Sequence, residues 1–315
     1  MSSSTKHSIP VAGFVVTLVG AILFSTKAII VKLAFAGTHT DALTLLTLRM
    51  LFALPFYVVA AFAVSSRSSN VKLKGKEWAF VLALGMLGYY LSSLFDFIGL
   101  QYISAGLERL ILFLYPTFAV FINAYFFKQK IAGVQRVALL LTYAGIALAY
   151  FGELAIDSSN PNFYFGSFMV FLCATTYAMY IVGSGRVIPH IGSTKFTAYA
   201  MLAATAGIFV HFAIAGDTTK FQAEHGLWLY GLLLAVVATV IPSFMLSYGL
   251  KSVGSNNVAI ISGIGPVSTI IQAYFILGEK IVIEQIIGTA LVIAGVILIG
   301  WKRKPAAIVE EVTAA

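Results

Sequence analysis

The sequence predicts an all-α membrane protein of ten transmembrane helices, arranged as two inverted five-helix repeats with both termini in the cytoplasm. Its composition, an internal repeat and the charges of its loops lead to this prediction. Of 315 residues, 60% are hydrophobic and only 10% are charged, and the mean hydropathy is +0.94. A soluble domain of this length cannot bury so much apolar surface, so the surrounding solvent must be lipid.

The internal repeat has an offset of 150 residues. The stretch GLQYISAGLERLILFLYP, which ends at Pro116, matches GLKSVGSNNVAIISGIGP, which ends at Pro266. The register continues without a gap through Lys130 and Lys280, so an internal duplication is predicted. The predicted units are a first repeat at 11–152, a second repeat at 165–301 and a short cytoplasmic tail at 302–315.

The spans follow from length. A hydrocarbon core of about 30 Å needs roughly 20 helical residues. The first apolar run continues past Lys27 to Phe35 without a signal-peptide cleavage site, so we interpret it as an uncleaved first span. Cutting the rest at clusters of charge, Gly, Pro and Asn predicts ten spans, at 10–36, 42–65, 77–100, 103–127, 132–152, 165–186, 196–215, 227–250, 254–277 and 281–301.

Positive charge orients these spans. Most of the 20 basic residues fall at the N-terminus and in alternate connections, whereas the other connections hold only Lys220 and Lys280 beside several acidic residues. Lys and Arg accumulate in cytoplasmic loops, so both termini are predicted to be inside and the localisation to be the inner (plasma) membrane. Each repeat contains an odd number of spans, so the second must be inverted relative to the first.

Four motifs resemble a known family. They are VGAILFSTKAIIVK in the first span, TLRM in the second, SAGLERLILFLYP in the fourth and the GEK turn after the ninth. In this order, and with the duplication, the chain resembles the EamA family of the drug/metabolite transporter superfamily over residues 11–301. The resemblance implies a transporter of ten spans for small metabolites, amino acids among them, often exported. It does not supply the substrate.

Six ionisable residues lie inside the predicted spans, all in the first repeat and all in one predicted leaflet: Lys27, Lys32, Arg49, Asp96, Glu108 and Arg109. Each costs roughly 2.5–3.5 kcal/mol on insertion scales, so it needs a partner or a cavity. One interpretation is a salt-bridge network, for example Asp96 with Arg109. The other is a polar vestibule in which an unpaired Lys27 or Arg49 receives an anionic group. Lys32 is expected to extend toward water and is left out of the site.

The predicted substrate site contains these charges and nearby hydroxyls. Lys27, Arg49 and Arg109 are expected to contact a substrate carboxylate. Asp96 and Glu108 would contact an ammonium group, balance charge or carry a proton. The remaining predicted contacts are Tyr89, Ser93, Tyr115, Tyr180 and Ser243.

Two prolines interrupt equivalent spans. Pro116 and Pro266 each remove a backbone donor, and Gly263 and Gly265 loosen the second position further. These residues are predicted hinges, with a static bend as the alternative.

The sequence contains no HExxH motif, no His/Cys metal spacing and no Gly-rich P-loop. An enzyme, a metal or other resident cofactor and ATP-driven transport are therefore not expected, and the basic loops are interpreted as orientation signals rather than a nucleic-acid surface. The predicted function is alternating-access secondary export of amino acids or related carboxylates through the bilayer. A passive facilitator and an intramembrane sensor or receptor are the alternatives. Proton coupling, direction and assembly as a homodimer are left open.

Overall fold

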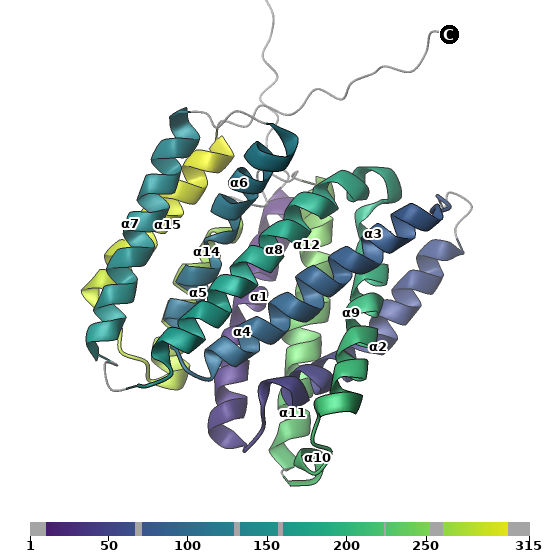
Figure 1. Cartoon of the computed structure of the whole chain (residues 1–315), viewed down its shortest axis with the longest axis horizontal. Coiled ribbons are helices and arrows are strands. Elements are labelled where there is room, and N and C mark those ends of the chain that lie inside the picture. Colours follow the sequence, from purple (N-terminus) through teal and green to yellow (C-terminus); the bar gives the residue numbers. More distant parts are fainter. Residues whose placement is uncertain are drawn as a thin grey trace, which may run out of the picture.

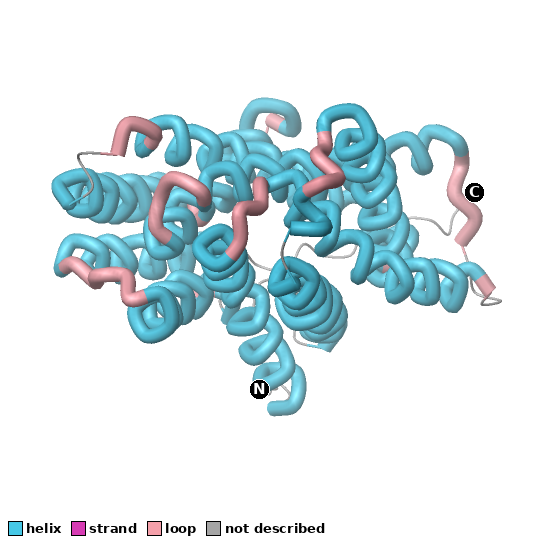
Figure 2. The backbone as a smooth tube through the Cα atoms, turned by 90° about the horizontal axis from the view of Figure 1, so that it is seen from below, coloured by secondary structure: helices cyan, strands magenta, loops and turns pink. Residues whose placement is uncertain are grey.

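A computed structural model describes residues 11–66, 71–128, 133–156, 160–223, 225–252 and 261–301. Throughout these ranges the regular structure is helical and no strand occurs, as Figure 2 shows. The first half contains α1 (Val11–Gly37), α2 (Ala42–Ser65), α3 (Gly75–Gly85), the π-helix η1 (Met86–Leu91), α4 (Ser92–Leu100), α5 (Ala105–Leu112), α6 (Tyr115–Phe127) and α7 (Gly133–Ile156).

The second half repeats this series. It contains α8 (Phe163–Ile191), α9 (Ser193–Ala215), the short α10 (Lys220–Ala223), α11 (His225–Ala235), η2 (Val236–Val240), α12 (Ile241–Ser252), α14 (Ile264–Gln272), η3 (Ala273–Leu277) and α15 (Ile283–Trp301). Adding 150 to the bounds of η1 gives 236–241, which is where η2 lies. The repeat found in the sequence therefore extends to an unusual local helix geometry.

Seven helices of the described ranges are long and apolar enough to cross a membrane. Three shorter apolar helices, Arg136–Gly152, Ile264–Leu277 and Ile283–Gly295, lie at the predicted fifth, ninth and tenth spans. Large apolar side chains such as Phe62, Ile214 and Phe275 are mostly exposed, as expected where lipid is the solvent. Ten crossings with both termini inside stay a prediction.

The helices pack in pairs that repeat when the two halves are exchanged. α4 packs on α8 as α12 packs on α1, and α3 packs on α9 as α11 packs on α2. α2 packs on its own counterpart α9, and α7 on its counterpart α15; Figure 1 shows the last two side by side at one edge of the molecule. This pattern is that of two halves related by an approximate two-fold axis.

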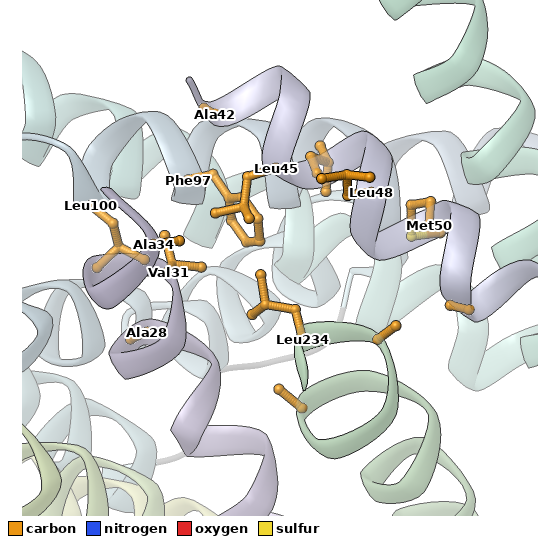
Figure 3. Packing of buried hydrophobic residues seen from close by; sticks show 14 of the residues in the cluster. Ala28, Val31, Ala34, Ala42, Leu45, Leu48, Met50, Phe97, Leu100 and Leu234 are labelled. Carbon is orange, nitrogen blue, oxygen red and sulfur yellow. The ribbon is translucent and has the colours of Figure 1, made fainter. Parts of the chain in front are cut away.

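The main core lies where α1, α2, α4 and α11 meet. Ala28, Leu45, Phe97 and Leu234 are fully buried there, and Figure 3 shows them on the helices that meet in this core. This core holds the outer half of α1 and the first turns of α2 against α4, which is the region that contains the charged residues.

Both predicted hinge prolines follow a break in a helix. α5 ends at Leu112, and Pro116 lies in the first turn of α6. Gly263 precedes α14, and Gly265 and Pro266 lie in its first turn. Pro is tolerated there because its missing N–H would have no intrahelical partner. The interruptions are a finding, whereas hinge motion at them stays a prediction.

Candidate functional site

Lys27 and Asp96 form a buried ion pair between α1 and α4. The Lys27 ammonium lies 2.6 Å from Oδ2 of Asp96, and both side chains are buried. The sequence offered Arg109 as an example of a partner for Asp96, and the structure replaces it with Lys27. The reason is that Asp96 faces α1 across the core, whereas the Arg109 side chain points away toward α14. Lys27 is therefore not the unpaired cation of the vestibule.

Arg109 joins the two halves of the molecule. Its Nε donates to Oγ1 of Thr269 on α14 at 3.1 Å, and its Nη2 donates to the Phe24 carbonyl at 3.4 Å. The guanidinium also lies over the Phe24 ring, 5.8 Å from its centroid. Its hydrogen bonds thus go to neutral groups of α1 and α14, and they fix the position of α5.

Glu108 lies in the first turn of α5 and is fully buried. Its carboxyl group interacts electrostatically with that of Asp96. Neither carboxyl oxygen of Glu108 has a hydrogen-bond partner in the described part of the chain. Lys27, Asp96 and Glu108 are thus brought together, as the sequence predicted for the charges as a group.

Arg49 differs from the other buried cations. Its Nη2 donates to Oγ of Ser93 at 2.9 Å, and its guanidinium lies 5.2 Å from the centroid of the Phe97 ring. The Nε is buried without a hydrogen-bond partner, and none of the described carboxylates forms an ion pair with this side chain. A guanidinium has five N–H donors, so Arg49 retains donors for a further acceptor.

Tyrosines line the next layer. The hydroxyls of Tyr89 and Tyr180 are 2.8 Å apart, and the Tyr177 ring packs on Tyr180 and Tyr115, with centroid distances of 5.7 and 5.1 Å. Tyr89, Tyr115 and Tyr180 were predicted site residues, and the structure brings them together. Tyr89 belongs to η1, and π-helical turns are frequent at functional sites.

Ser243 meets a residue that the sequence reasoning missed. Its Oγ is 3.0 Å from the hydroxyl of Tyr57 on α2. Ser243 is the repeat counterpart of Ser93, so equivalent serines of the two halves bind two side chains of one helix, Arg49 and Tyr57. The matching serines at an offset of 150 were the signal that could have found this.

The charged cluster is closed to solvent in this structure. Lys27, Arg49, Asp96, Glu108 and Arg109 are at most 7% exposed. A groove elsewhere, between α2, α9 and α12, is lined by Pro55, Phe56, Val59, Ala60, Ala63, Val64, Thr194 and Phe244. Its lining is mostly apolar and contains none of the five charged residues. The groove is therefore separate from the polar site.

Hydrogen bonds close the end of the molecule that is predicted to be outside. Ala105 N donates to Oε1 of Glu279 at 3.0 Å, and Asn160 donates to the Tyr102 carbonyl at 2.7 Å. Lys32, which was left out of the predicted site, donates to the Ile103 carbonyl at 2.9 Å in the same region. At the opposite end Lys195 donates to the Val71 carbonyl. The connections predicted to share a side of the membrane are thus bonded to one another.

Comparison with known proteins places the chain in a family. The model of the EamA-like transporter family matches residues 11–151 and 164–301. A transporter of Bacillus subtilis named YcbK, described as uncharacterized, is 34% identical over 284 residues, which cover 88% of this chain and 89% of that protein. An uncharacterized transporter of Archaeoglobus fulgidus is 23% identical and covers 91% of this chain and 95% of its own length.

A solved crystal structure of a protein with 16% identity has a TM-score of 0.65 and covers 94% of this chain and 98% of its own. At this identity the likeness shows the fold alone. The two family matches coincide with the two halves that pack about the approximate two-fold axis, and the relatives are named transporters. The chain is a multi-pass membrane protein that belongs to the EamA-like transporter family.

Proposed function

We propose that the protein is a secondary transporter that moves a small carboxylate-bearing metabolite, an amino acid or a close relative, out of the cell across the plasma membrane. The single observation that carries the proposal is Arg49. It is buried, its Nε has no partner, and among the described side chains no carboxylate forms a direct ion pair with it. An uncompensated buried charge is costly, and a substrate carboxylate would supply a bidentate partner.

The groups around Arg49 suit a solute of this class. Ser93 already binds the guanidinium, and the hydroxyls of Tyr89 and Tyr180 offer further polar contacts. Ser243 and Tyr57 bring in the second repeat. Lys27 holds Asp96, and Arg109 holds α5 against α14, so these two cations are assigned to the framework of the site.

Alternating access is supported by the pairing of the helices. The contacts repeat when the halves are exchanged, and an odd number of spans in each half would make them inverted in the membrane. Two such halves can exchange conformations and so open the site to either side. The helix interruptions before Pro116 and Pro266 are the proposed hinges, because they already lack part of the helical hydrogen bonding.

The test is counterflow in proteoliposomes with a mixed library of amino acids and small carboxylates, on the wild type and on Arg49→Ala. Truncating a buried cation that holds a carboxylate removes about 3–5 kcal/mol of interaction, so uptake at sub-saturating solute is expected to fall by about 100-fold or more. Arg136→Ala is the matched control, because Arg136 is an exposed arginine of α7.

The other outcomes have distinct meanings. Unchanged uptake in Arg49→Ala would contradict the assigned site and place the solute path along the neutral hydroxyls. Failure of the wild type to take up any solute would contradict transport and favour a sensor or receptor. Solute movement without accumulation under any ion gradient would identify a passive facilitator.

A further inference from the structure

Asp96 and Glu108 form a carboxyl pair in the middle of the buried cluster. Both side chains are 0% exposed, and their carboxyl groups lie close enough to interact electrostatically. Two ionised carboxylates that share a buried site repel each other, so such a pair favours a state in which one of the two groups carries a proton.

The surroundings identify which member carries it. Asp96 keeps its negative charge, because the Lys27 ammonium lies 2.6 Å from its Oδ2. Neither oxygen of Glu108 has a hydrogen-bond partner in the described part of the chain. An ionised Glu108 would be a buried charge without a donor, which costs more than a buried neutral carboxylic acid. The proton is therefore assigned to Glu108.

Other charged and titratable groups face this pair from the neighbouring helices. They are Lys27 on α1, Arg49 on α2, Arg109 on α5 and Cys173 on α8. Arg109 is next to Glu108 in the chain and acts on it through space, but its hydrogen bonds go to Thr269 and the Phe24 carbonyl. Glu108 thus has a positive charge nearby without a hydrogen bond from it.

Glu279 caps the N-terminus of the helix that contains Glu108. Its carboxylate accepts from the backbone N–H groups of Ala105 and Gly106, at 3.0 and 3.5 Å, and so closes the N-terminus of α5. Glu108 lies in the first turn of the same helix. If this contact opens, water reaches that turn, where the partial positive charge of the helix N-terminus favours the ionised carboxylate.

We propose that Glu108 is a proton-coupling site of the transporter, an inference that rests on the proposed function. In the closed state Glu108 holds one proton beside the ion pair of Asp96 with Lys27, and it exchanges this proton with water when Glu279 separates from α5. When Glu108 releases its proton to a water molecule, it becomes a negatively charged carboxylate. When it takes a proton from hydronium, it becomes neutral again. The pair thereby links the opening of the outer end to the binding or release of a proton.

Infrared spectroscopy of the full chain in lipid tests the proton without any substrate. A protonated carboxylic acid absorbs through its carbonyl stretch, separately from a carboxylate. The wild type at neutral pH is expected to show this band, and Glu108→Gln is expected to lose it. Glu77→Gln is the control, because Glu77 is an exposed glutamate that accepts from Lys74 N. Asp96→Asn gives a second variant, in which the band should shift because the neighbouring negative charge is removed. Absence of a Glu108-dependent band in the wild type would overturn the assignment.

A transport measurement tests the coupling separately. Wild-type proteoliposomes are given an outward or inward gradient of one pH unit, which supports at most about tenfold accumulation for one proton per solute. Accumulation that follows the gradient in the wild type and no longer follows it in Glu108→Gln is the expected result. Counterflow that is equal with and without the gradient in the wild type would overturn the coupling. Absence of counterflow altogether would count against the proposed function, and the infrared result would still decide whether Glu108 holds a proton.

Discussion

The three buried cations of the site meet the cost of burial in three different ways. Lys27 has a carboxylate partner, and Arg109 donates to a hydroxyl and a backbone carbonyl. In the described part of the chain, Arg49 donates only through Nη2, to Ser93 and to the Met50 sulfur, and its Nε has no partner. A buried charge is tolerated where its donors are satisfied, so this contrast supports the proposal that Arg49 binds the substrate carboxylate.

The environment of Asp41 predicts how the stability of the folded protein depends on pH. Asp41 precedes the first turn of α2, where Thr44 N donates to Oδ1 at 2.8 Å, and Lys220 reaches Oδ2 at 2.5 Å. Burial alone would raise the pKa of Asp41, but the hydrogen bonds of Lys220 and Thr44 hold the pKa below its ordinary value of 3.8. The folded state therefore binds fewer protons than the unfolded state. The contribution to stability is present above about pH 4 and is lost as the pH falls through the lowered pKa.

The measurement is thermal unfolding in detergent between pH 6 and 3, comparing the wild type with Asp41→Asn. Asparagine still accepts from Thr44 N and keeps the helix cap, so the difference isolates the ion pair, about 0.2–1 kcal/mol for a pair this exposed. The two melting temperatures should differ at pH 6 and converge toward pH 3. A constant difference at every pH would contradict the assignment of the lowered pKa to the folded state.

What the sequence predicts at the residue scale is the set of charges but not their partners. Hydropathy located Lys27, Asp96, Glu108 and Arg109 in one leaflet, because a charge interrupts an apolar run visibly. The partner of each charge depends on which face of its helix meets a neighbouring helix. A sequence of nearly uniform hydrophobicity does not show which face that is. Asp96 consequently meets Lys27 instead of Arg109.

Among the helices, α7 and α15 depend on close contact between backbones. A Cβ on Gly145 would lie 2.5 Å from the Gly288 carbonyl oxygen and 2.9 Å from Cβ of Leu291. Glycine lets two membrane helices approach in this way, and packing of this kind stabilises helix pairs in lipid. This pair also joins the two halves, so its spacing affects the whole molecule.

Gly145→Ala is therefore expected to destabilise the protein by about 1–3 kcal/mol through overpacking. The control is Gly185→Ala, because Gly185 lies in α8 with nothing within 4 Å of the added Cβ. That variant should be neutral or stabilising by up to about 1 kcal/mol, since alanine is the better helix former. Thermal unfolding in detergent compares the two, and equal effects would rule out the close contact of α7 with α15.

Most helix bounds were predictable to within a few residues, but helix interruptions were not. The predicted span at 42–65 coincides with α2, whereas η1, η2 and η3 had no counterpart in the prediction. A π-helical turn changes the hydrogen-bond register without changing the apolar composition, so hydropathy does not detect it. Pro116 and Pro266 were the residues from which helix breaks could be predicted, and both lie in the first turn after a break.

Across the molecule, the approximate two-fold relation connects the site to the mechanism. Counterpart helices of the two repeats pack on one another, and counterpart serines bind side chains about two turns apart on α2. The five charged residues of the buried cluster, however, all belong to the first repeat. The two halves therefore share a framework but contribute differently to the cluster, and we expect the outer and inner routes to the site to differ chemically.

The inverted arrangement of the two repeats is the central claim, and labelling of two single cysteines tests it most directly. Lys128 and Lys280 are exposed residues of the equivalent turns before α7 and α15, and the one native cysteine, Cys173, is buried and can be replaced by alanine. In that background Lys280→Cys should react with a membrane-impermeant maleimide added to intact cells, and Lys128→Cys should react only after the membrane is opened. Labelling of both cysteines from the same side would contradict the inverted repeat and, with it, alternating access between two exchangeable halves.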